Sequence, residues 1–244
     1  MKYRDLFGDG KPVIAMLHLK GYDPANTLDR VKAETAAYLE AGVEAVMVEN
    51  YYGTAGDCER TLAWLQEAKL PLCYGVNILG DFEHAFRLSA KYGASFVQID
   101  SVCGHLPPEK EQKLLLDKLQ AARAGTNVVL LGGVRFKYQP VRSGRSLEED
   151  LRLGMERCDA IVVTGEGTGL ATPQEKVQEF RRILGDFPLI VGAGVTIDTV
   201  EESLRVADGM IVGSYFKQGH RDSGDVEPAY VQAFMDKKRS MQLK

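Results

Sequence analysis

Eight short apolar runs, each followed by a helical pattern, constrain the fold of this 244-residue chain more than any other feature. The runs are rich in Val and Ile and nearly continuous in hydrophobicity, which is typical of parallel strands that are covered on both faces. The segments between them, among them 28–34, 59–68 and 174–184, carry apolar residues at helical spacing. The runs start near Pro12, Glu44, Pro71, Ser95, Asn127, Asp159, Pro188 and Asp208.

This alternation predicts an α/β fold, a single (β/α)8 TIM barrel that spans residues 1–244 as one domain. The starts of the runs lie roughly 28 residues apart, a normal length for one strand–helix unit with short loops. Eight units favour a closed barrel because an open doubly wound sheet usually holds five or six strands. A division into two half-size domains is the less favoured alternative, since no Pro/Ser-rich linker interrupts the pattern.

Several helix ends carry local signals. Asp57 and Thr172 are predicted N-caps, the latter with Pro173 at the first helical position. Three glycines follow helical stretches where a left-handed residue is expected: Gly42, Gly93 and Gly185.

Composition excludes several classes of protein. The net charge is −4, and no broad cluster of Lys and Arg suggests a nucleic-acid partner. The four cysteines form no CxxC pair, which fits a reducing cytoplasm. No apolar run approaches the roughly 20 residues of a membrane span, and no signal peptide is evident. We therefore expect a cytoplasmic protein without integral membrane association, with a symmetric homo-oligomer as the default assembly.

Polar residues end most of the predicted strands, and in a TIM barrel the active site is built at those ends. Helix caps and packing alone would not require so many ionisable or strongly hydrogen-bonding side chains there. The set therefore outlines a site: His18, Glu49, Asn50, Asn77, Asp100, Arg135, Lys137, Thr164 and Glu166.

The last two strands end in glycine-rich turns that predict a phosphate site. Gly192-Ala193-Gly194 ends the seventh run and Gly213-Ser214 ends the eighth. Loops at these positions form the recurring phosphate site of TIM barrels, because glycine lets backbone N–H groups approach an anion. The alternative is that these glycines only make tight turns. We expect a small phosphorylated ligand, with contributions from Asn77, Thr164 and Gly165.

No cofactor is predicted from these turns. Neither the segment 192–196 nor the segment 165–169 has the G-x-G-x-x-G spacing of a dinucleotide site, so NAD is not expected.

His18, Glu49 and Asp100 form the predicted acid–base set. Each can move a proton near neutral pH once burial and neighbouring charges shift its pKa. The alternatives are a structural histidine at the barrel mouth and carboxylates that cap helices or form ion pairs. With His105 these side chains suit a divalent metal, but no close ligand motif is present, so no metal site is assigned.

The segment from Arg135 to Arg145 holds four cations and no acid. It follows the fifth strand and would either close over an anionic substrate or remain a solvated loop. Lys137 is a catalytic candidate, with Schiff-base formation as a minor alternative. Cys103, in the loop after the fourth strand, is a weaker candidate for a thiol nucleophile.

The motifs at the strand ends resemble those of the BtpA/SgcQ family over nearly the whole chain. The matching segments are 11–19 (KPVIAMLHL), 48–50 (VEN), 75–79 (GVNIL), 161–165 (IVVTG) with 168–169 (TG), 192–196 (GAGVT), and 207–214 (ADGMIVGS) with Lys217. The chain departs from the family in the loop 100–105 and at Arg135-Phe136-Lys137, where a Lys-His pair is common. The resemblance implies a TIM barrel. One family branch is linked to photosystem I accumulation with peripheral membrane association, the other to sugar-utilisation genes.

Two functions follow as hypotheses. The first is an isomerase, epimerase, lyase or hydrolase that acts by acid–base chemistry on a phosphorylated sugar or related metabolite, which predicts an open polar pocket. The second is a non-catalytic assembly or biogenesis factor related to photosystem I accumulation, which predicts an occluded mouth and a large exposed apolar patch.

Overall fold

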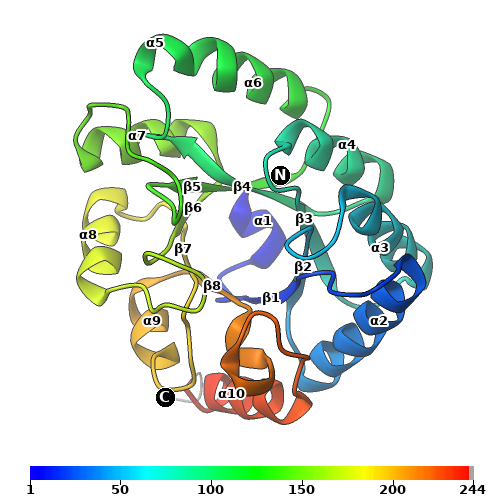
Figure 1. The fold of residues 1–244 in the computed structure, drawn as a ribbon. Helices are drawn as coiled ribbons and strands as arrows, with labels where there is room; N and C mark the ends of the chain where they lie inside the picture. Colours follow the sequence, from blue (N-terminus) through cyan, green and yellow to red (C-terminus); the bar gives the residue numbers. More distant parts are fainter. Residues whose placement is uncertain (242–244) are drawn as a thin grey trace.

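The eight apolar runs form the strands of a closed parallel barrel in the computed structural model, which describes residues 1–241 (Figure 1). Each strand pairs in parallel with its neighbours in sequence, and β8 pairs with β1 to close the barrel. The predicted (β/α)8 fold is confirmed. The strands are β1 (Val13–Leu17), β2 (Ala45–Glu49), β3 (Cys73–Asn77), β4 (Phe96–Cys103), β5 (Val129–Val134), β6 (Ala160–Val163), β7 (Leu189–Gly192) and β8 (Gly209–Val212).

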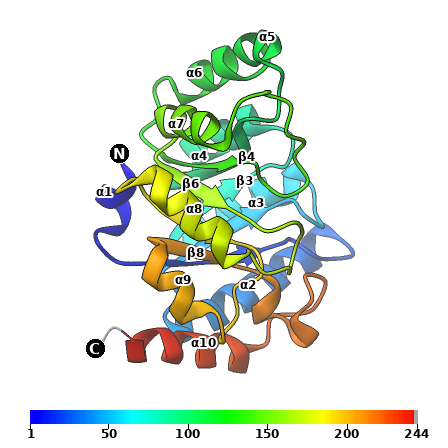
Figure 2. The ribbon, with the colours of Figure 1, turned by 90° about the vertical axis from the view of Figure 1, so that its left-hand side faces the viewer.

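Helices other than α1 surround the barrel, and most of them connect its strands (Figures 1 and 2). None of the helices within residues 1–241 is long and apolar enough to cross a membrane. They are α1 (Tyr3–Phe7), α2 (Pro24–Ala41), α3 (Ala55–Ala68), α4 (Phe82–Tyr92), α5 (Pro108–Glu111), the π-helical turn η1 (Gln112–Leu116), α6 (Asp117–Arg123), α7 (Leu147–Arg157), α8 (Gln174–Leu184), α9 (Val200–Val206), the 3₁₀ turns η2 (Ser214–Phe216) and η3 (Gln218–His220), and α10 (Pro228–Met241).

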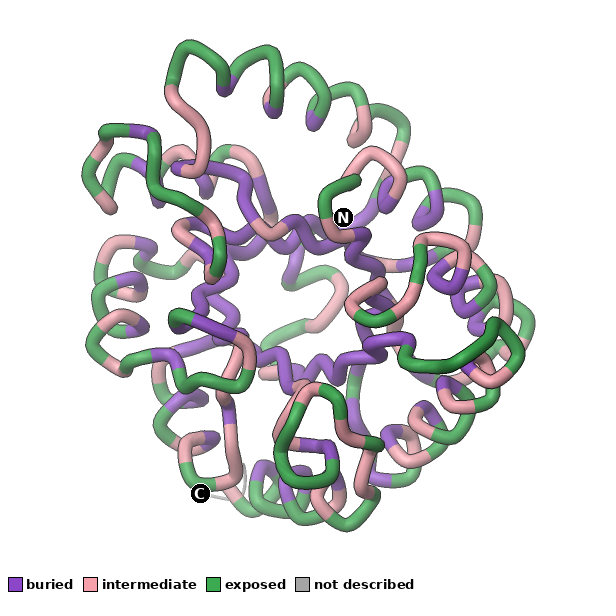
Figure 3. The backbone as a smooth tube through the Cα atoms, in the orientation of Figure 1, coloured by how far each residue is buried: buried purple, intermediate pink, exposed green. Residues whose placement is uncertain are grey.

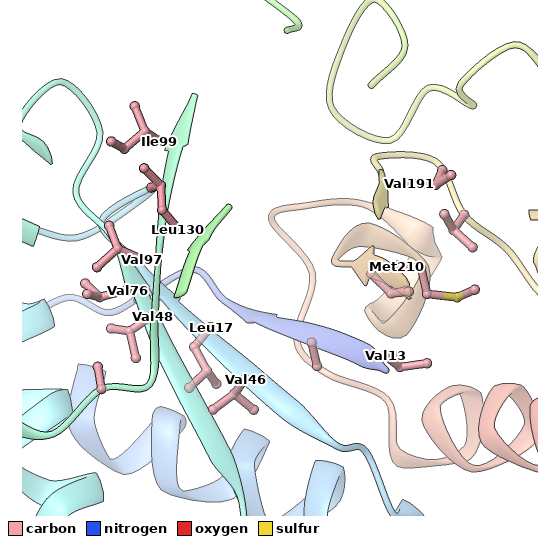
Figure 4. Close-up of a cluster of buried hydrophobic side chains, with 14 of the residues drawn as sticks. Val13, Leu17, Val46, Val48, Val76, Val97, Ile99, Leu130, Val191 and Met210 are labelled. Atoms are coloured by element: carbon pink, nitrogen blue, oxygen red, sulfur yellow. The ribbon is translucent and has the colours of Figure 1, made fainter. Parts of the chain in front are cut away.

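The strands are largely apolar because both of their faces are buried, as the ring of buried backbone in Figure 3 shows. Val13 and Leu17 of β1 belong to the core between barrel and helices, part of which is drawn in Figure 4. Ile14 and Met16 alternate with them and belong to the core inside the barrel. This period of two is the alternation of side chains along a strand.

The short helix α1 closes the N-terminal end of the barrel, an element that the strand–helix alternation did not predict. Tyr3 is buried, and its hydroxyl donates a hydrogen bond to the carbonyl of Asp208, just before β8 begins. Phe7 packs against Phe96 inside the barrel, with 6.1 Å between ring centroids. Figure 1 shows α1 in the centre of the ring of strands.

Both predicted N-caps are wrong, the first by three residues and the second by one. Thr54 caps α3, and Asp57 is the third helical residue, whose carboxylate accepts from the backbone N–H of Thr54 in a capping box. Pro173 occupies the N-cap position of α8. Thr172 donates its hydroxyl to the carbonyl of Gly192 instead, because the chain there packs against the end of β7.

The glycines predicted at the C-terminal ends of helices adopt two kinds of backbone conformation. Gly42 and Gly93 are left-handed, with φ of 77° and 70°, as predicted. Gly185 has φ of 58° but ψ of −122°, so it ends α8 outside the left-handed helical region. All three positions have a positive φ, which favours glycine.

Candidate functional site

The C-terminal ends of the strands enclose a cavity of about 140 Å³. Its floor is apolar and includes Met16, Val162 and Ile211, whereas polar groups surround its mouth. Asn77 lies beside the cavity, hydrogen-bonded to two of its carboxylates, and Gly165 lies outside it. The predicted residues that line it are His18, Glu49, Asp100, Lys137, Thr164, Gly192, Gly194, Gly213 and Ser214.

Two carboxylates share one amide donor at this mouth. The Asn77 Nδ2 atom lies 3.0 Å from Glu49 Oε1 and 3.1 Å from Asp100 Oδ1. Burial, reinforced by the charge of Asp100, raises the pKa of Glu49 to about 7. Burial also raises the pKa of Asp100. A carboxyl group with a pKa near 7 can both accept and donate a proton at neutral pH, which suits general acid–base catalysis.

His18 lies directly beside Glu49. Its ring stacks on Tyr51 with 4.9 Å between centroids, and its Nε2 atom lies 3.7 Å from Glu49 Oε2. Burial, followed by the charge of Lys217, holds the pKa of His18 well below its usual range. The imidazole is therefore neutral at physiological pH.

Lys217 is a buried cation that sequence reasoning matched to the family but gave no role. Its Nζ atom lies 2.6 Å from His18 Nδ1 and donates to the carbonyl of Asp222 at 3.0 Å. Burial lowers its pKa to about 8. The sequence signal that could have identified Lys217 as a site residue is its position, three residues after Ser214 and near the end of a barrel strand.

Lys137 lies on the opposite side of the mouth in a second polar cluster. Its Nζ atom donates to the hydroxyl of Thr168 at 2.9 Å, and that hydroxyl also accepts from Tyr51 at 3.3 Å. The backbone N–H of Lys137 donates to Thr164 Oγ1, which fixes the start of the loop. Lys137 therefore brings a positive charge to the cavity, and its role as a Schiff-base lysine stays a prediction.

The glycine-rich turns are shaped by close backbone contacts. Gly194 has φ of 63°, and a Cβ atom there would lie 2.3 Å from the backbone of Leu170 and Ala171. A side chain at position 213 would lie 3.5 Å from His18 Nε2, so Gly213 leaves that nitrogen accessible. Within residues 1–241, no protein acceptor is found for the backbone N–H groups of Gly194, Gly213 or Ser214. These donors are free for a ligand.

Gln98 is a further cavity residue that sequence reasoning missed. It is 4% exposed, and its Nε2 atom donates to Asp100 Oδ1 at 3.5 Å. Its Oε1 atom is buried without a hydrogen-bond partner. The sequence held one signal for this residue. Gln98 is a polar residue inside the apolar run SFVQID, and it lies two positions before Asp100 and thus on the same face of β4.

Most cations of the predicted basic loop do not face the cavity. Arg135 and Arg145 form ion pairs of 3.1 and 2.9 Å with Asp150, whose side chain is fully buried. Arg145 also pairs with Glu111. These contacts hold both ends of the loop beside α7, and the closure of the loop over a substrate stays a prediction. Lys137 is the loop cation that lines the cavity.

Cys103 and His105 belong to the structure of the β4–α5 region. Cys103 is buried, and burial raises the pKa of its thiol to about 12, which leaves no thiolate for nucleophilic attack. His105 Nδ1 lies 2.8 Å from the hydroxyl of Ser101. Among the described residues, no group of three or more His, Cys, Asp and Glu side chains is placed to hold a metal ion.

The fold and this mouth define a (β/α)8 barrel with buried acid–base groups at the C-terminal ends of its strands. The chain belongs to the BtpA family, whose model matches residues 9–240. An uncharacterized protein of Pyrococcus horikoshii is 28% identical, covering 89% of this chain and 92% of its own. The photosystem I biogenesis protein BtpA of Synechocystis is 21% identical, covering 94% of this chain and 88% of its own.

Solved structures with similar folds include enzymes. A structure described as native KDPGal superposes with a TM-score of 0.67 at 16% identity, covering 96% of this chain and 97% of its own. Phosphoribosyl anthranilate isomerase from Thermus thermophilus superposes with a TM-score of 0.63 at 15% identity, covering 94% and 99%. At these identities the likeness establishes the barrel fold alone.

Proposed function

We propose that this protein is an enzyme that performs acid–base chemistry on a phosphorylated sugar or a related small metabolite. The observation that carries the proposal is the position of Gly213, which places the glycine turns beside the acid–base groups. A Cβ atom at this residue would lie 3.5 Å from His18 Nε2, and Ser214 follows directly. One small ligand could therefore reach both sets of groups.

The glycine turns support an anion-binding role. Gly194, Gly213 and Ser214 line the cavity, no protein acceptor is found within residues 1–241 for their backbone N–H groups, and the charge of Lys137 lies at the same mouth. Donors of this kind at the ends of the last two strands form the usual phosphate site of the fold. A phosphoryl group is expected there because its oxygens accept several hydrogen bonds at once.

The buried groups support proton transfer at the carbon skeleton. His18, Glu49 and Asp100 all line the cavity, and Glu49 has a pKa of about 7. Perturbed pKa values of this kind cluster at functional sites. The set fits isomerisation, epimerisation, aldol-type cleavage or hydrolysis, each of which needs a positioned acid and base.

The deep end of the cavity favours a ligand that presents a hydrogen-bond donor. The unpartnered Oε1 atom of Gln98 is the acceptor, and its neighbours on the floor are apolar. A cavity of about 150 Å³ holds a benzene-sized molecule, so the buried part of the ligand is small. A hydroxyl group of a short sugar phosphate satisfies both conditions.

The test measures binding of inorganic phosphate and of a panel of three- to six-carbon sugar phosphates, by calorimetry and by thermal shift. Ser214→Asp places a negative charge in the proposed phosphate site. It is expected to weaken the binding of phosphate-bearing ligands at least tenfold, since like charges repel strongly in a poorly solvated site. Ser214→Ala is the matched control: it removes at most one side-chain hydrogen bond and adds no charge, so its loss of affinity should be clearly smaller than that of Ser214→Asp. Gly194 is unsuitable for substitution because its backbone contacts leave no space for a side chain.

Two results would contradict the proposal. The first is that the wild-type protein binds none of these phosphate compounds. The second is that Ser214→Asp and Ser214→Ala bind them equally well. Turnover that survives both His18→Ala and Glu49→Gln would instead remove these two residues as catalytic groups while leaving the phosphate anchor intact.

A binding role at the barrel mouth is the second candidate function. Five large apolar side chains are exposed on loops that follow the strands: Tyr22, Tyr52, Tyr138, Val141 and Leu170. The photosystem I biogenesis role carried in the name of the Synechocystis relative is one assembly function of this kind. Replacement of Tyr22 and Val141 by Ser would abolish such a role and leave sugar-phosphate binding unchanged.

A further inference from the structure

We propose that Lys217 is a positioning residue that fixes His18 as a neutral imidazole with its proton on Nε2, directed toward a substrate carbonyl group. The assignment of Lys217 rests on the contacts around His18. The carbonyl substrate deepens the proposed function and rests on it.

The hydrogen bond between the two side chains determines which ring nitrogen carries the proton. Lys217 Nζ lies 2.6 Å from His18 Nδ1. A protonated lysine donates and cannot accept, so Nδ1 must be the acceptor with a free lone pair. In a neutral imidazole the proton is then on Nε2, because each tautomer has one donor and one acceptor nitrogen.

The ammonium group is held in place by the chain around it. Its second hydrogen bond goes to the carbonyl of Asp222 at 3.0 Å. The backbone of Lys217 donates to Ser214 and forms an antiparallel bridge with Val226. The preceding Phe216 is fully buried and packs edge-on against a neighbouring aromatic ring of α10. Lys217 thus has little freedom to leave His18.

The other side of the imidazole faces the reacting groups. Tyr51 stacks on the ring, and the Nε2 atom lies 3.7 Å from Glu49 Oε2. This separation is too long for a hydrogen bond. The absence of a side chain at Gly213 keeps Nε2 open to the cavity. Nε2–H and the Glu49 carboxylate are therefore adjacent groups that a ligand can contact together.

The charges around the pair favour a protonated lysine and a neutral imidazole. Burial is the largest influence on Lys217 and lowers its pKa to about 8, and Lys20 acts in the same direction. Glu34 of α2, Asp222 and Glu49 favour the charged form of Lys217, which is retained at neutral pH. Around His18, burial and the charges of Lys217 and Lys137 all disfavour the imidazolium, and a contact with Asp222 favours it. The net result is one positive charge in the pair, located on the lysine.

A neutral N–H donor beside a carboxylate base is one arrangement that catalyses enolisation. Glu49 removes a proton from the carbon next to the carbonyl group, and the electron pair of that C–H bond forms a C=C bond. The carbonyl π electrons move to oxygen, where Nε2–H stabilises the developing charge. The hydroxyl proton of the enediolate moves through Nε2 to the former carbonyl oxygen, so that this hydroxyl carbon becomes the new carbonyl group. Return of the proton from Glu49 to the former carbonyl carbon then completes an isomerisation without any oxidant. The substrate class is thus a phosphorylated α-hydroxy aldehyde or ketone.

The tautomer can be measured without a substrate. In protein labelled with 15N-histidine, long-range 1H–15N spectra distinguish a protonated ring nitrogen from one with a lone pair. The four histidines give few signals, and His18→Gln assigns the one that matters. At pH 6.5 to 7.0 the wild-type protein is expected to show His18 in one neutral form, with Nε2 protonated. An Nδ1-protonated ring or an imidazolium would overturn the proposal.

Lys217→Met is the decisive variant, because it keeps the length and apolar stem of lysine but removes the donor. We expect the single tautomer to become a mixture and the His18 pKa to rise. Lys217→Gln retains an N–H donor without charge and is expected to keep more of the Nε2 tautomer than Lys217→Met does. An unchanged His18 spectrum in a folded Lys217→Met protein would contradict the role of Lys217. If that variant does not fold, the wild-type spectrum alone decides.

Failure of this inference is distinguishable from failure of the proposed function. Loss of phosphate binding contradicts the anchor at Ser214 and leaves the His18 tautomer unaffected. For the carbonyl substrate, the expected readout is exchange of a carbon-bound hydrogen of dihydroxyacetone phosphate or ribulose 5-phosphate with deuterium from solvent, at least tenfold slower in Lys217→Met. If the protein binds both compounds and exchanges neither, the enolisation step is wrong.

Discussion

The two ends of the barrel are built from the same strands but bury opposite kinds of side chain. At the N-terminal end, α1 inserts Tyr3 and Phe7 beneath an apolar interior that includes Phe96. At the C-terminal end, Glu49 and His18 are buried to a similar degree with their ionisable groups facing a cavity. Burial of apolar area stabilises a fold, whereas burial of an ionisable group opposes it unless the charge is compensated.

This contrast separates the end of the barrel that stabilises the fold from the end that is suited to chemistry. Gln98 and Phe96 are two residues apart on the same face of β4, yet Phe96 fills the barrel while Gln98 leaves an oxygen without a partner. A buried acceptor without a partner costs roughly 1–3 kcal/mol. Such a cost is expected where the missing partner is a ligand. The following predictions test the contrast, from the largest effect to the smallest.

Truncation of a buried side chain at the N-terminal end of the barrel, which α1 closes, should destabilise the protein most. Tyr3→Ala removes a buried ring and its hydrogen bond to Asp208, and we expect the free energy of unfolding to fall by about 3–5 kcal/mol. Denaturant unfolding measures the change. Tyr3→Phe, which removes only the hydroxyl, should cost about 1 kcal/mol. Equal effects of the two variants would show that the ring does not stabilise the barrel.

Replacement of the buried carboxylate at the open end should stabilise the protein, with a pH dependence. The pKa of Glu49 rises from 4.5 to about 7 on folding, so the folded state favours the neutral carboxyl and loses stability as pH rises between these values. Glu49→Gln should therefore stabilise the protein by up to about 3 kcal/mol at pH 8 and have little effect at pH 4.5.

Thermal unfolding at both pH values measures this difference, at about 2–4 °C per kcal/mol for a chain of this size. Glu175→Gln, on the exposed surface of α8, is the control and should change stability by less than about 0.5 kcal/mol. A Glu49→Gln protein that is less stable than wild type at pH 8 would mean that the carboxylate is compensated in the fold.

The pH dependence of turnover should follow the same buried groups. Activity on a phosphorylated substrate is expected to rise tenfold per pH unit below about pH 7, where Glu49 becomes ionised, and to fall above about pH 8, where Lys217 loses its proton. The neighbouring charges of Asp100 and Lys137 act on Glu49 in opposite directions, and Asn77 favours its ionised form. A profile of kcat/KM that is flat from pH 6 to 9 would contradict Glu49 as the base.

The smallest effect on stability is expected at Gln98. Gln98→Met has a similar volume. It removes the unpartnered oxygen but also the hydrogen bond from Nε2 to Asp100, and because these two effects oppose each other the free energy of unfolding should change by less than about 1 kcal/mol. The same variant should reduce the affinity for a sugar phosphate more than the affinity for inorganic phosphate, because inorganic phosphate does not need to reach the floor of the cavity. Equal losses for the two ligands would exclude Gln98 as a ligand contact.

Much of the candidate site was predictable because strand ends in a closed barrel converge. His18, Glu49 and Asp100 lie in three different strand–helix units, and the fold alone brings them to one mouth. The positions of Lys217, just beyond the eighth strand, and of Gln98, a polar residue within an apolar run, could be noticed in the sequence, but their contributions to the site could not be assigned from it. Their importance depends on burial and on hydrogen-bond partners, which sequence spacing does not encode.

The sequence by itself determined the barrel, because continuous apolar runs and amphipathic segments at regular spacing can bury their faces in few other ways. It also determined which strand ends are polar. The tertiary structure decided how those groups act on one another. Asn77 joins Glu49 to Asp100, and Lys217 reaches His18 across 199 positions of the chain. Such contacts set pKa values and tautomers, since electrostatic interactions depend on distance and burial rather than on order along the chain.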